Sequence, residues 1–193
     1  MVTSGACTYY AGCPTTNASG DSAGTLTISG GSLGTVMVPP GTGNVYQYMG
    51  ASGVTEFTAG QTLTVSASGA TVPAFGPESV IAPASVVLTA PAGSGGTYTI
   101  PTASDLSVTW TGGQPNAQIL FEGVDSTGAS YFSCTWDASL GSATVPHAVL
   151  TGLAGQTGGF LAYGQYTTTT FTAGAYSISV YALPYGGGTA SFQ

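Results

Sequence analysis

Apolar and polar residues alternate along most of this chain, and the apolar positions seldom follow the spacing of an amphipathic helix. In "TLTISGG" the alternation places Leu26 and Ile28 on one face, and in "LSVTWTGG" it does the same for Leu106, Val108 and Trp110. The stretches "QTLTVSASG" and "AYSISVYAL" repeat the pattern. Successive side chains of a β-strand point to opposite faces, so these stretches predict strands with one buried face.

Short runs rich in Gly, Ser, Asn and Pro separate these stretches, such as "SGGSLG", "PPGTGN", "PAGSGG" and "PYGGGT". Strands joined by turns, without helical crossovers, are typical of antiparallel sandwiches and barrels. We therefore expect an all-β protein, an antiparallel β-sandwich of the immunoglobulin-like or jelly-roll-like kind. At most one or two short helical turns are expected, around "VPHAVLTGLAG", where Pro146 fits a first-turn position.

The domain organisation is predicted to be simple. Residues 1–20 are expected to form an N-terminal segment, and residues 21–193 a single β-sandwich domain. Three prolines cluster within residues 72–85. We interpret this stretch as a crossover between sheets, and a division into two sub-domains there is the alternative.

Charge is the most unusual feature of the composition. The chain of 193 residues has no lysine or arginine, seven acidic residues and one histidine, while 42% of its residues are hydrophobic. Nucleic-acid binding requires cations that displace counterions from phosphates, so we expect no nucleic-acid partner. Electrostatic docking to an anionic membrane is excluded for the same reason. Any buried carboxylate must be stabilised by hydrogen bonds, a proton or a metal ion.

The three cysteines are Cys7, Cys13 and Cys134. A bridge between Cys7 and Cys13 would close a short loop, and we predict this pairing, which leaves Cys134 unpaired. Pairing of Cys134 with Cys7 or Cys13 is the alternative, because sequence alone cannot select one connectivity. Disulfides persist in oxidising compartments, so the sequence favours an extracellular or cell-surface location.

Cys134 and His147, the single histidine, raise the question of a nucleophile and its base. Residues 118–136 form a predicted hairpin around "DSTGAS", in which Phe121 faces Cys134 and Ile119 faces Trp136. Both strands then direct the same face to the core, so Cys134 lies among aromatic residues. A thiol in apolar surroundings has a raised pKa and is inert. We therefore interpret Cys134 as structural and expect no catalytic pair.

Other candidate chemistry is weak. "GGSLG" matches the nucleophile elbow of hydrolases at Ser32, but that motif requires a strand followed by a helix, and strand patterns flank it here. Zinc and copper sites need several convergent His or Cys ligands, so no such site is expected. Calcium prefers oxygen ligands, and Glu122 and Asp125 near the hairpin tip are its candidates. Asp137 lies about 16 Å away along the strand and cannot join them.

Tyrosine is abundant, with 11 copies in the chain. The stretch "NVYQYMG" would place Tyr46 and Tyr48 on the same face of a strand. Such a pair could form an aromatic platform for a sugar. Packing inside the sandwich or against another subunit is the alternative interpretation.

Three longer stretches resemble a known group of proteins. These are "TVPAFGPESVIAPASVVLTAPA", "IPTASDLSVTWTGG" and "FSCTWDASLGSATVPHAVLTGL". They are similar to segments of secreted or lipid-anchored all-β proteins of myxobacteria, over about residues 20–182. The resemblance implies an extracellular β-sandwich and transfers no catalytic residue to this chain. The chain departs from the group in lacking basic residues and in having His147 where a small residue is usual.

These observations favour an extracellular structural or adhesive cell-surface protein without catalytic activity. It would associate with itself, as a filament or layer subunit, or with cell-surface components. The main alternative is a carbohydrate- or calcium-binding module, and a hydrolase that uses Ser32 or Cys134 with His147 is a remote one. No cofactor is expected unless calcium binds.

Overall fold

The computed structural model describes residues 1–12, 20–32, 34–48 and 55–193. Most of the regular structure in these residues is β-strand, and their helical segments are single turns of three or four residues. The prediction of an all-β sandwich protein is confirmed. The helical turns are the following: η1 Thr42–Asn44, η2 Ala138–Leu140, α1 His147–Leu150 and η3 Thr151–Leu153. The last two occupy the predicted helical stretch, with Pro146 as the N-cap of α1, whereas η1 and η2 exceed the one or two turns that were expected.

The chain divides into two compact units. Unit 1 comprises Met1–Thr15, Ala84–Tyr166 and Pro184–Gln193, and unit 2 comprises Thr16–Pro83 and Thr167–Leu183. This differs from the expected single domain, and one crossing point, between residues 83 and 84, lies inside the proline-containing stretch 72–85. The N-terminal strands also belong to unit 1 rather than to a separate segment. The division has a physical basis, because each unit encloses a hydrophobic cluster of its own.

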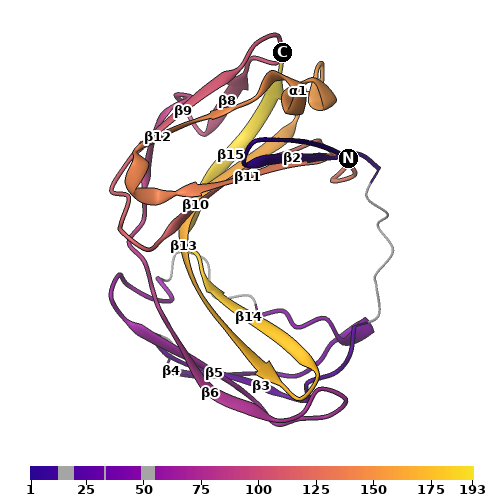
Figure 1. The fold of residues 1–193 in the computed structure, drawn as a ribbon, viewed down its shortest axis with the longest axis vertical. Helices are drawn as coiled ribbons and strands as arrows, with labels where there is room; N and C mark the ends of the chain where they lie inside the picture. The colour runs from indigo at the N-terminus through magenta and orange to yellow at the C-terminus, as the bar shows by residue number, and fades with distance from the viewer. Residues whose placement is uncertain (13–19, 33, 49–54) are drawn as a thin grey trace. The chain divides into compact units, whose positions relative to one another are not determined.

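Unit 1 contains two sheets. The larger has the order β1-β2-β11-β10-β13-β15-β8, with antiparallel neighbours except for the parallel pair β15–β8. Its strands are β1 Val2–Ser4, β2 Cys7–Tyr10, β8 Thr97–Ile100, β10 Gln118–Val124, β11 Tyr131–Asp137, β13 Gly159–Ala173 and β15 Tyr185–Phe192. The smaller has the order β12-β9-β7, formed by β7 Val87–Ala90, β9 Leu106–Thr111 and β12 Ser142–Val145. Figure 1 shows these two layers within the unit.

The core of unit 1 lies between these sheets. Leu106, Val108 and Trp110 of β9 are buried, as the alternation predicts. They belong to the same cluster as Phe121 of β10 and Cys134 of β11, which are paired in the predicted register. Side chains from both sheets therefore fill one interior, which is the defining feature of a sandwich.

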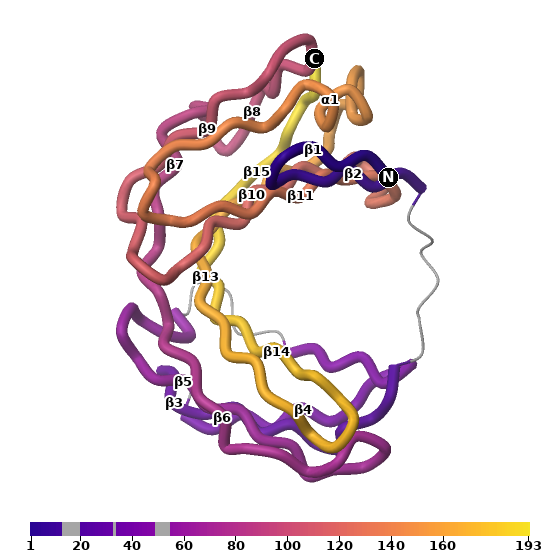
Figure 2. Tube along the Cα trace, viewed as in Figure 1, coloured from indigo at the N-terminus to yellow at the C-terminus, as the bar shows by residue number. Residues whose placement is uncertain are grey.

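Unit 2 is a smaller assembly of strands. Its sheet has the order β4-β3-β5-β6, formed by β3 Leu26–Gly31, β4 Gly34–Val38, β5 Thr62–Ala67 and β6 Phe75–Ile81. The end of β13 and β14 (Tyr176–Ala182) form a hairpin in the same unit, which Figure 2 shows opposite this sheet. The hydroxyl of Thr169 on β13 donates a hydrogen bond of 2.7 Å to the carbonyl of Ser79 on β6. Thr167 donates in the same way to the carbonyl of Ile81.

Candidate functional site

Cys7 is covalently bonded to Cys134, so the predicted Cys7–Cys13 bridge and the unpaired Cys134 are both wrong. The two residues face each other across the antiparallel pair β2–β11 and are buried in the core of unit 1. The pairing of the strands explains this bond. β2 pairs with the edge of β11 that β10 does not occupy, and in this register Cys7 lies opposite Cys134. Cys13 lies outside the described residues. The pairing is the alternative that the sequence left open.

The Cys134–His147 catalytic pair is excluded by the same bond, because a disulfide sulfur cannot act as a thiolate nucleophile. His147 is exposed at the start of α1. Its backbone N–H donates a 2.7 Å hydrogen bond to the Asp105 carboxylate. This contact occupies a backbone donor of the first helical turn, where acceptors are needed.

Ser32 lies in the turn between the antiparallel strands β3 and β4. This confirms the strand–turn–strand interpretation of "GGSLG", and a nucleophile elbow would need a helix after the serine. The Ser32 N–H donates a 2.7 Å hydrogen bond to the carbonyl of Glu56. The turn therefore holds a neighbouring segment in place.

The carboxylate of Asp125, a calcium candidate, accepts hydrogen bonds within the turn that joins β10 to β11. One carboxylate oxygen accepts hydrogen bonds from the N–H and hydroxyl of Thr127, at 2.8 Å each, and from the N–H of Ala129 at 3.1 Å. The other accepts from the N–H of Ser130 at 2.9 Å. Burial opposes ionisation of this group, but the four hydrogen bonds outweigh it and lower the pKa of Asp125. The lone pairs that calcium would need are therefore engaged.

The other acidic candidates do not complete a metal site. Glu122 lies on β10, facing away from the core side occupied by Phe121. Asp137 accepts from the N–H and hydroxyl of Ser139, at 2.8 and 2.7 Å, and these bonds lower its pKa. Within residues 1–12, 20–32, 34–48 and 55–193, no three His, Cys, Asp or Glu side chains gather as metal ligands.

Contrary to the prediction from the pattern, Tyr46 and Tyr48 do not share the face of a strand. Residues 45–48 lie outside the strands, and Tyr46 packs against the core of unit 2. Its hydroxyl accepts a 2.8 Å hydrogen bond from the N–H of Ala23 and donates one of 2.7 Å to the carbonyl of Gly24. Tyr46 therefore anchors its segment to the chain before β3, while Tyr48, two residues later, is 45% exposed.

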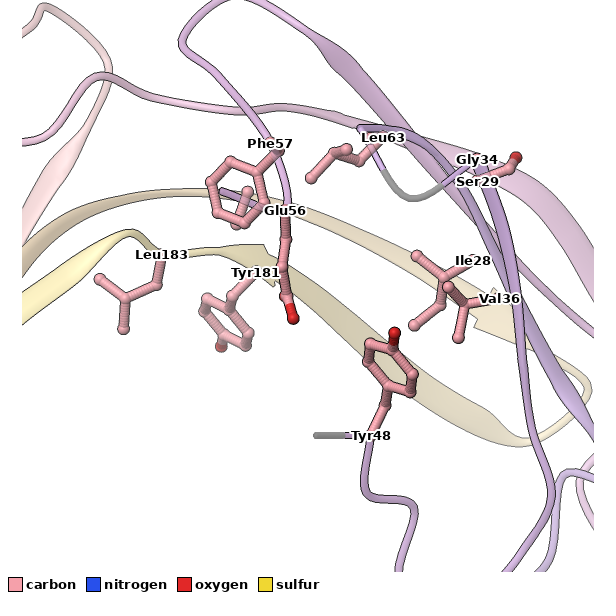
Figure 3. A pocket seen from close by; sticks show the side chains of 12 residues that line it. Ile28, Ser29, Gly34, Val36, Tyr48, Glu56, Phe57, Leu63, Tyr181 and Leu183 are labelled. Carbon is pink, nitrogen blue, oxygen red and sulfur yellow. The ribbon is translucent and has the colours of Figure 1, made fainter. Parts of the chain in front are cut away.

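Tyr48 borders a cavity in unit 2 of about 300 Å³ (Figure 3). The cavity is a candidate binding site within the described part of unit 2. β3 and β4 provide Ile28 and Val36, β5 provides Leu63, and the end of the β14 hairpin provides Tyr181. The full lining is Ile28, Ser29, Gly31, Gly34, Val36, Tyr48, Glu56, Phe57, Leu63, Tyr181, Ala182 and Leu183.

The backbone of the segment that carries Glu56 and Phe57 is fixed. Its Glu56 carbonyl accepts the hydrogen bond from Ser32 and lies so close to Gly31 that a Cβ there would come within 2.3 Å of it. Farther along, the N–H of Thr58 donates a 2.8 Å hydrogen bond to the side chain of Gln61. Glycine at position 31 thus permits the approach that brings Glu56 and Phe57 to the cavity wall.

The cavity is apolar with one ionisable acid. Glu56 is the single charged residue among the described lining residues, and it is half-buried. The Ser29 hydroxyl is already hydrogen-bonded to that of Thr64, at 2.7 Å. Most of the remaining surface comes from aliphatic and aromatic side chains. Such a site favours an apolar body with a positive or neutral polar end.

Sequence reasoning missed Glu56, Phe57 and Tyr181. The one local signal was the acid–aromatic pair "EF" in a chain with few charges. Their convergence depends on segments more than a hundred residues apart, since Tyr181 belongs to β14 and Glu56 precedes β5. No spacing in the sequence brings these segments together.

A scan against protein-family models finds no match, and a search of curated proteins finds no similar sequence. In the described part of the chain, no helix combines the length and the apolar character needed to cross a membrane.

Proposed function

We propose that the protein is an extracellular structural or adhesive protein whose copies associate through strand edges. The observation that carries this proposal is β4, an end strand of the unit 2 sheet with the sequence "GTVMV". It contains neither proline nor charge, and Met37, its fourth residue, is 68% exposed. An end strand presents unpaired backbone N–H and C=O groups, which pair readily with a strand from another chain.

The opposite end of the same sheet is protected. β6 contains Pro77 and Glu78, and proline and charge both discourage pairing at an edge. Its Ser79 and Ile81 carbonyls accept hydrogen bonds from threonine hydroxyls on β13. The contrast between β4 and β6 supports β4 as the edge available to a partner.

Two features of the chain, its disulfide and its lack of basic residues, support an extracellular location. A disulfide joins Cys7 to Cys134 in the core, and such bonds persist mainly in oxidising compartments. The chain also lacks lysine and arginine, so trypsin-like proteases have no site to cleave. The resemblance to secreted all-β proteins also favours an extracellular location.

Sedimentation velocity and negative-stain microscopy of the purified chain, over a range of concentrations, test the proposal. We expect concentration-dependent oligomers or filaments, and Met37→Lys should abolish them by placing a charge on the edge. Ile81→Lys is the matched control, because Ile81 is a 51% exposed apolar residue on the protected strand β6. Monodisperse single particles at every concentration would refute self-association.

A further inference from the structure

We propose that the unit 2 cavity binds a small organic cation with a methylated ammonium group, of the choline type. This inference goes beyond the structural role above and does not depend on self-association. It rests on three features of the cavity: aromatic rings from three segments, one carboxylate, and aliphatic walls (Figure 3).

The aromatic residues are Tyr48, Phe57 and Tyr181. Tyr48 follows η1, Phe57 precedes β5, and Tyr181 lies on β14. Three separate parts of unit 2 therefore place an aromatic ring at one cavity. The face of an aromatic ring carries negative electrostatic potential and attracts a cation. Methylated ammonium groups are bound by surrounding rings because their charge is spread over methyl groups that tolerate apolar contact.

The charge of the cavity also favours a cationic ligand. Glu56 lines it, and in the view of Figure 3 its carboxylate lies between the rings of Tyr48 and Tyr181. No lysine or arginine anywhere in the chain can neutralise this acid or attract an anion. An anionic ligand would therefore be repelled, and a cation would restore charge balance in a partly desolvated site.

The aliphatic walls argue against a sugar as the ligand. Ile28, Val36, Leu63 and Leu183 provide no hydrogen-bonding side-chain atoms, and the Ser29 hydroxyl is already paired with Thr64. Apart from Glu56 and the two tyrosines, the lining offers a monosaccharide few side-chain partners, so several of its hydroxyls would be buried without hydrogen bonds, at a cost in affinity. Methyl and methylene groups next to a quaternary nitrogen have no such requirement. The volume of about 300 Å³ is sufficient for a small organic ligand.

Isothermal titration calorimetry with choline and with 3,3-dimethyl-1-butanol tests the proposal. The two molecules have nearly the same shape, and the second replaces the charged nitrogen with carbon. We expect choline to bind at least about tenfold more tightly, because only its charge interacts with the carboxylate and the ring faces. Phosphocholine carries the same ammonium group beside an anionic phosphate. It should bind more weakly than choline, because Glu56 repels the phosphate, and tighter binding would contradict the role assigned to this carboxylate.

Two variants locate the binding. Glu56→Gln should lower the choline affinity by about tenfold and leave the affinity for the neutral alcohol unchanged. Tyr48→Leu should lower the choline affinity while preserving the apolar wall. Glu78→Gln on β6 is the matched control for loss of one acid in unit 2, and it should bind as the parent does.

Melting curves of each variant establish that it folds. If a variant does not fold, the comparison of choline with its neutral analogue in the parent protein decides. Equal affinity for the two molecules, no choline binding at millimolar concentration, or equal loss in Glu78→Gln and Glu56→Gln would overturn the proposal.

Discussion

Cys7 and Cys134 lie directly opposite each other on the antiparallel strands β2 and β11, with their Cα atoms 4.1 Å apart. This separation is typical of antiparallel pairs whose backbones do not hydrogen-bond to each other. The bond between them joins residues 127 positions apart and fixes the N-terminal hairpin to the larger sheet of unit 1. It therefore links the first strands of the chain to the centre of the core.

Replacement of both residues, Cys7→Ser and Cys134→Ser, should greatly reduce the free energy of unfolding. A cross-link that closes a loop of this length restricts the unfolded chain, and the chain-entropy estimate is about 5 kcal/mol. Two buried hydroxyls in an apolar cluster add a further cost. Urea unfolding of the parent and the double variant measures the difference.

Cys13→Ser is the control for this experiment, and it should leave the unfolding midpoint unchanged. Peptide mapping after digestion with pepsin or chymotrypsin identifies the pairing directly, since trypsin finds no lysine or arginine to cleave after. A cross-linked peptide that contains Cys7 and Cys13 would contradict the pairing of Cys7 with Cys134.

The β10–β11 hairpin shows what the sequence could predict. Phe121 pairs with Cys134 and Ile119 with Trp136, in the register deduced from alternation and one turn. Both strands have a strict apolar face, and a shift by one residue would expose all of it. The short turn at Asp125 then determines which residues of the two strands pair. Local pattern and local turn chemistry therefore determine this hairpin.

Contacts between distant segments could not be predicted in the same way. The pairing of β2 with β11 decides the partner of Cys7, and it joins strands separated by most of the chain. Ile28 shows a second limit of prediction from the sequence. Alternation placed it on the inner face of β3, yet its exposed fraction is 37%. It lines the cavity, so the pattern identified the correct face but not whether that face is filled.

Trp110→Phe should reduce stability by about 1–3 kcal/mol. The indole N–H of Trp110 donates a buried 2.8 Å hydrogen bond to the carbonyl of Ala138. Phenylalanine cannot replace this donor, so the carbonyl would remain buried without its partner. Urea unfolding followed by far-ultraviolet circular dichroism measures the loss.

Trp136→Phe is the comparison for that variant. Trp136 stacks on Trp110 with ring centroids 6.1 Å apart and an interplanar angle of 15°. Both variants should lose the near-ultraviolet signal of the coupled indoles, but Trp136→Phe should cost only about 0.5–1.5 kcal/mol. Equal destabilisation would show that the Ala138 hydrogen bond contributes little.

Gln165→Leu should destabilise unit 1 by about 3 kcal/mol, although leucine has a similar size. Gln165 is fully buried, and its amide group donates to the carbonyls of Ala84 and Gly112 at 2.7 and 3.2 Å. Its carbonyl accepts from the N–H of Gln114 at 3.0 Å. Leucine would leave all three backbone groups without this partner.

Gln118→Leu provides the matched control, because Gln118 is an exposed glutamine in the same sheet. Its loss should change the unfolding free energy by about 0.5 kcal/mol or less. Thermal melting of both variants gives the comparison. A Gln165→Leu protein as stable as the parent would mean that water replaces the lost amide contacts.

Asp125 should make stability depend on pH in the acid range. Its folded pKa is below the ordinary value of 3.8, because hydrogen bonds from Thr127, Ala129 and Ser130 favour the carboxylate more than burial disfavours it. The folded state therefore binds this proton less readily than the unfolded state does. The resulting stabilisation is fully present above the unfolded pKa and is lost as the pH falls through the folded pKa.

Asp125→Ala should accordingly be less stable than the parent at pH 6, and the difference should narrow steadily below pH 4, as the parent carboxylate becomes protonated. Urea unfolding of both proteins from pH 6 to pH 2 measures this narrowing. The part of the difference that remains at low pH reports contacts of the neutral side chain. A difference between parent and Asp125→Ala that is constant over this range would show that the turn does not stabilise the ionised carboxylate.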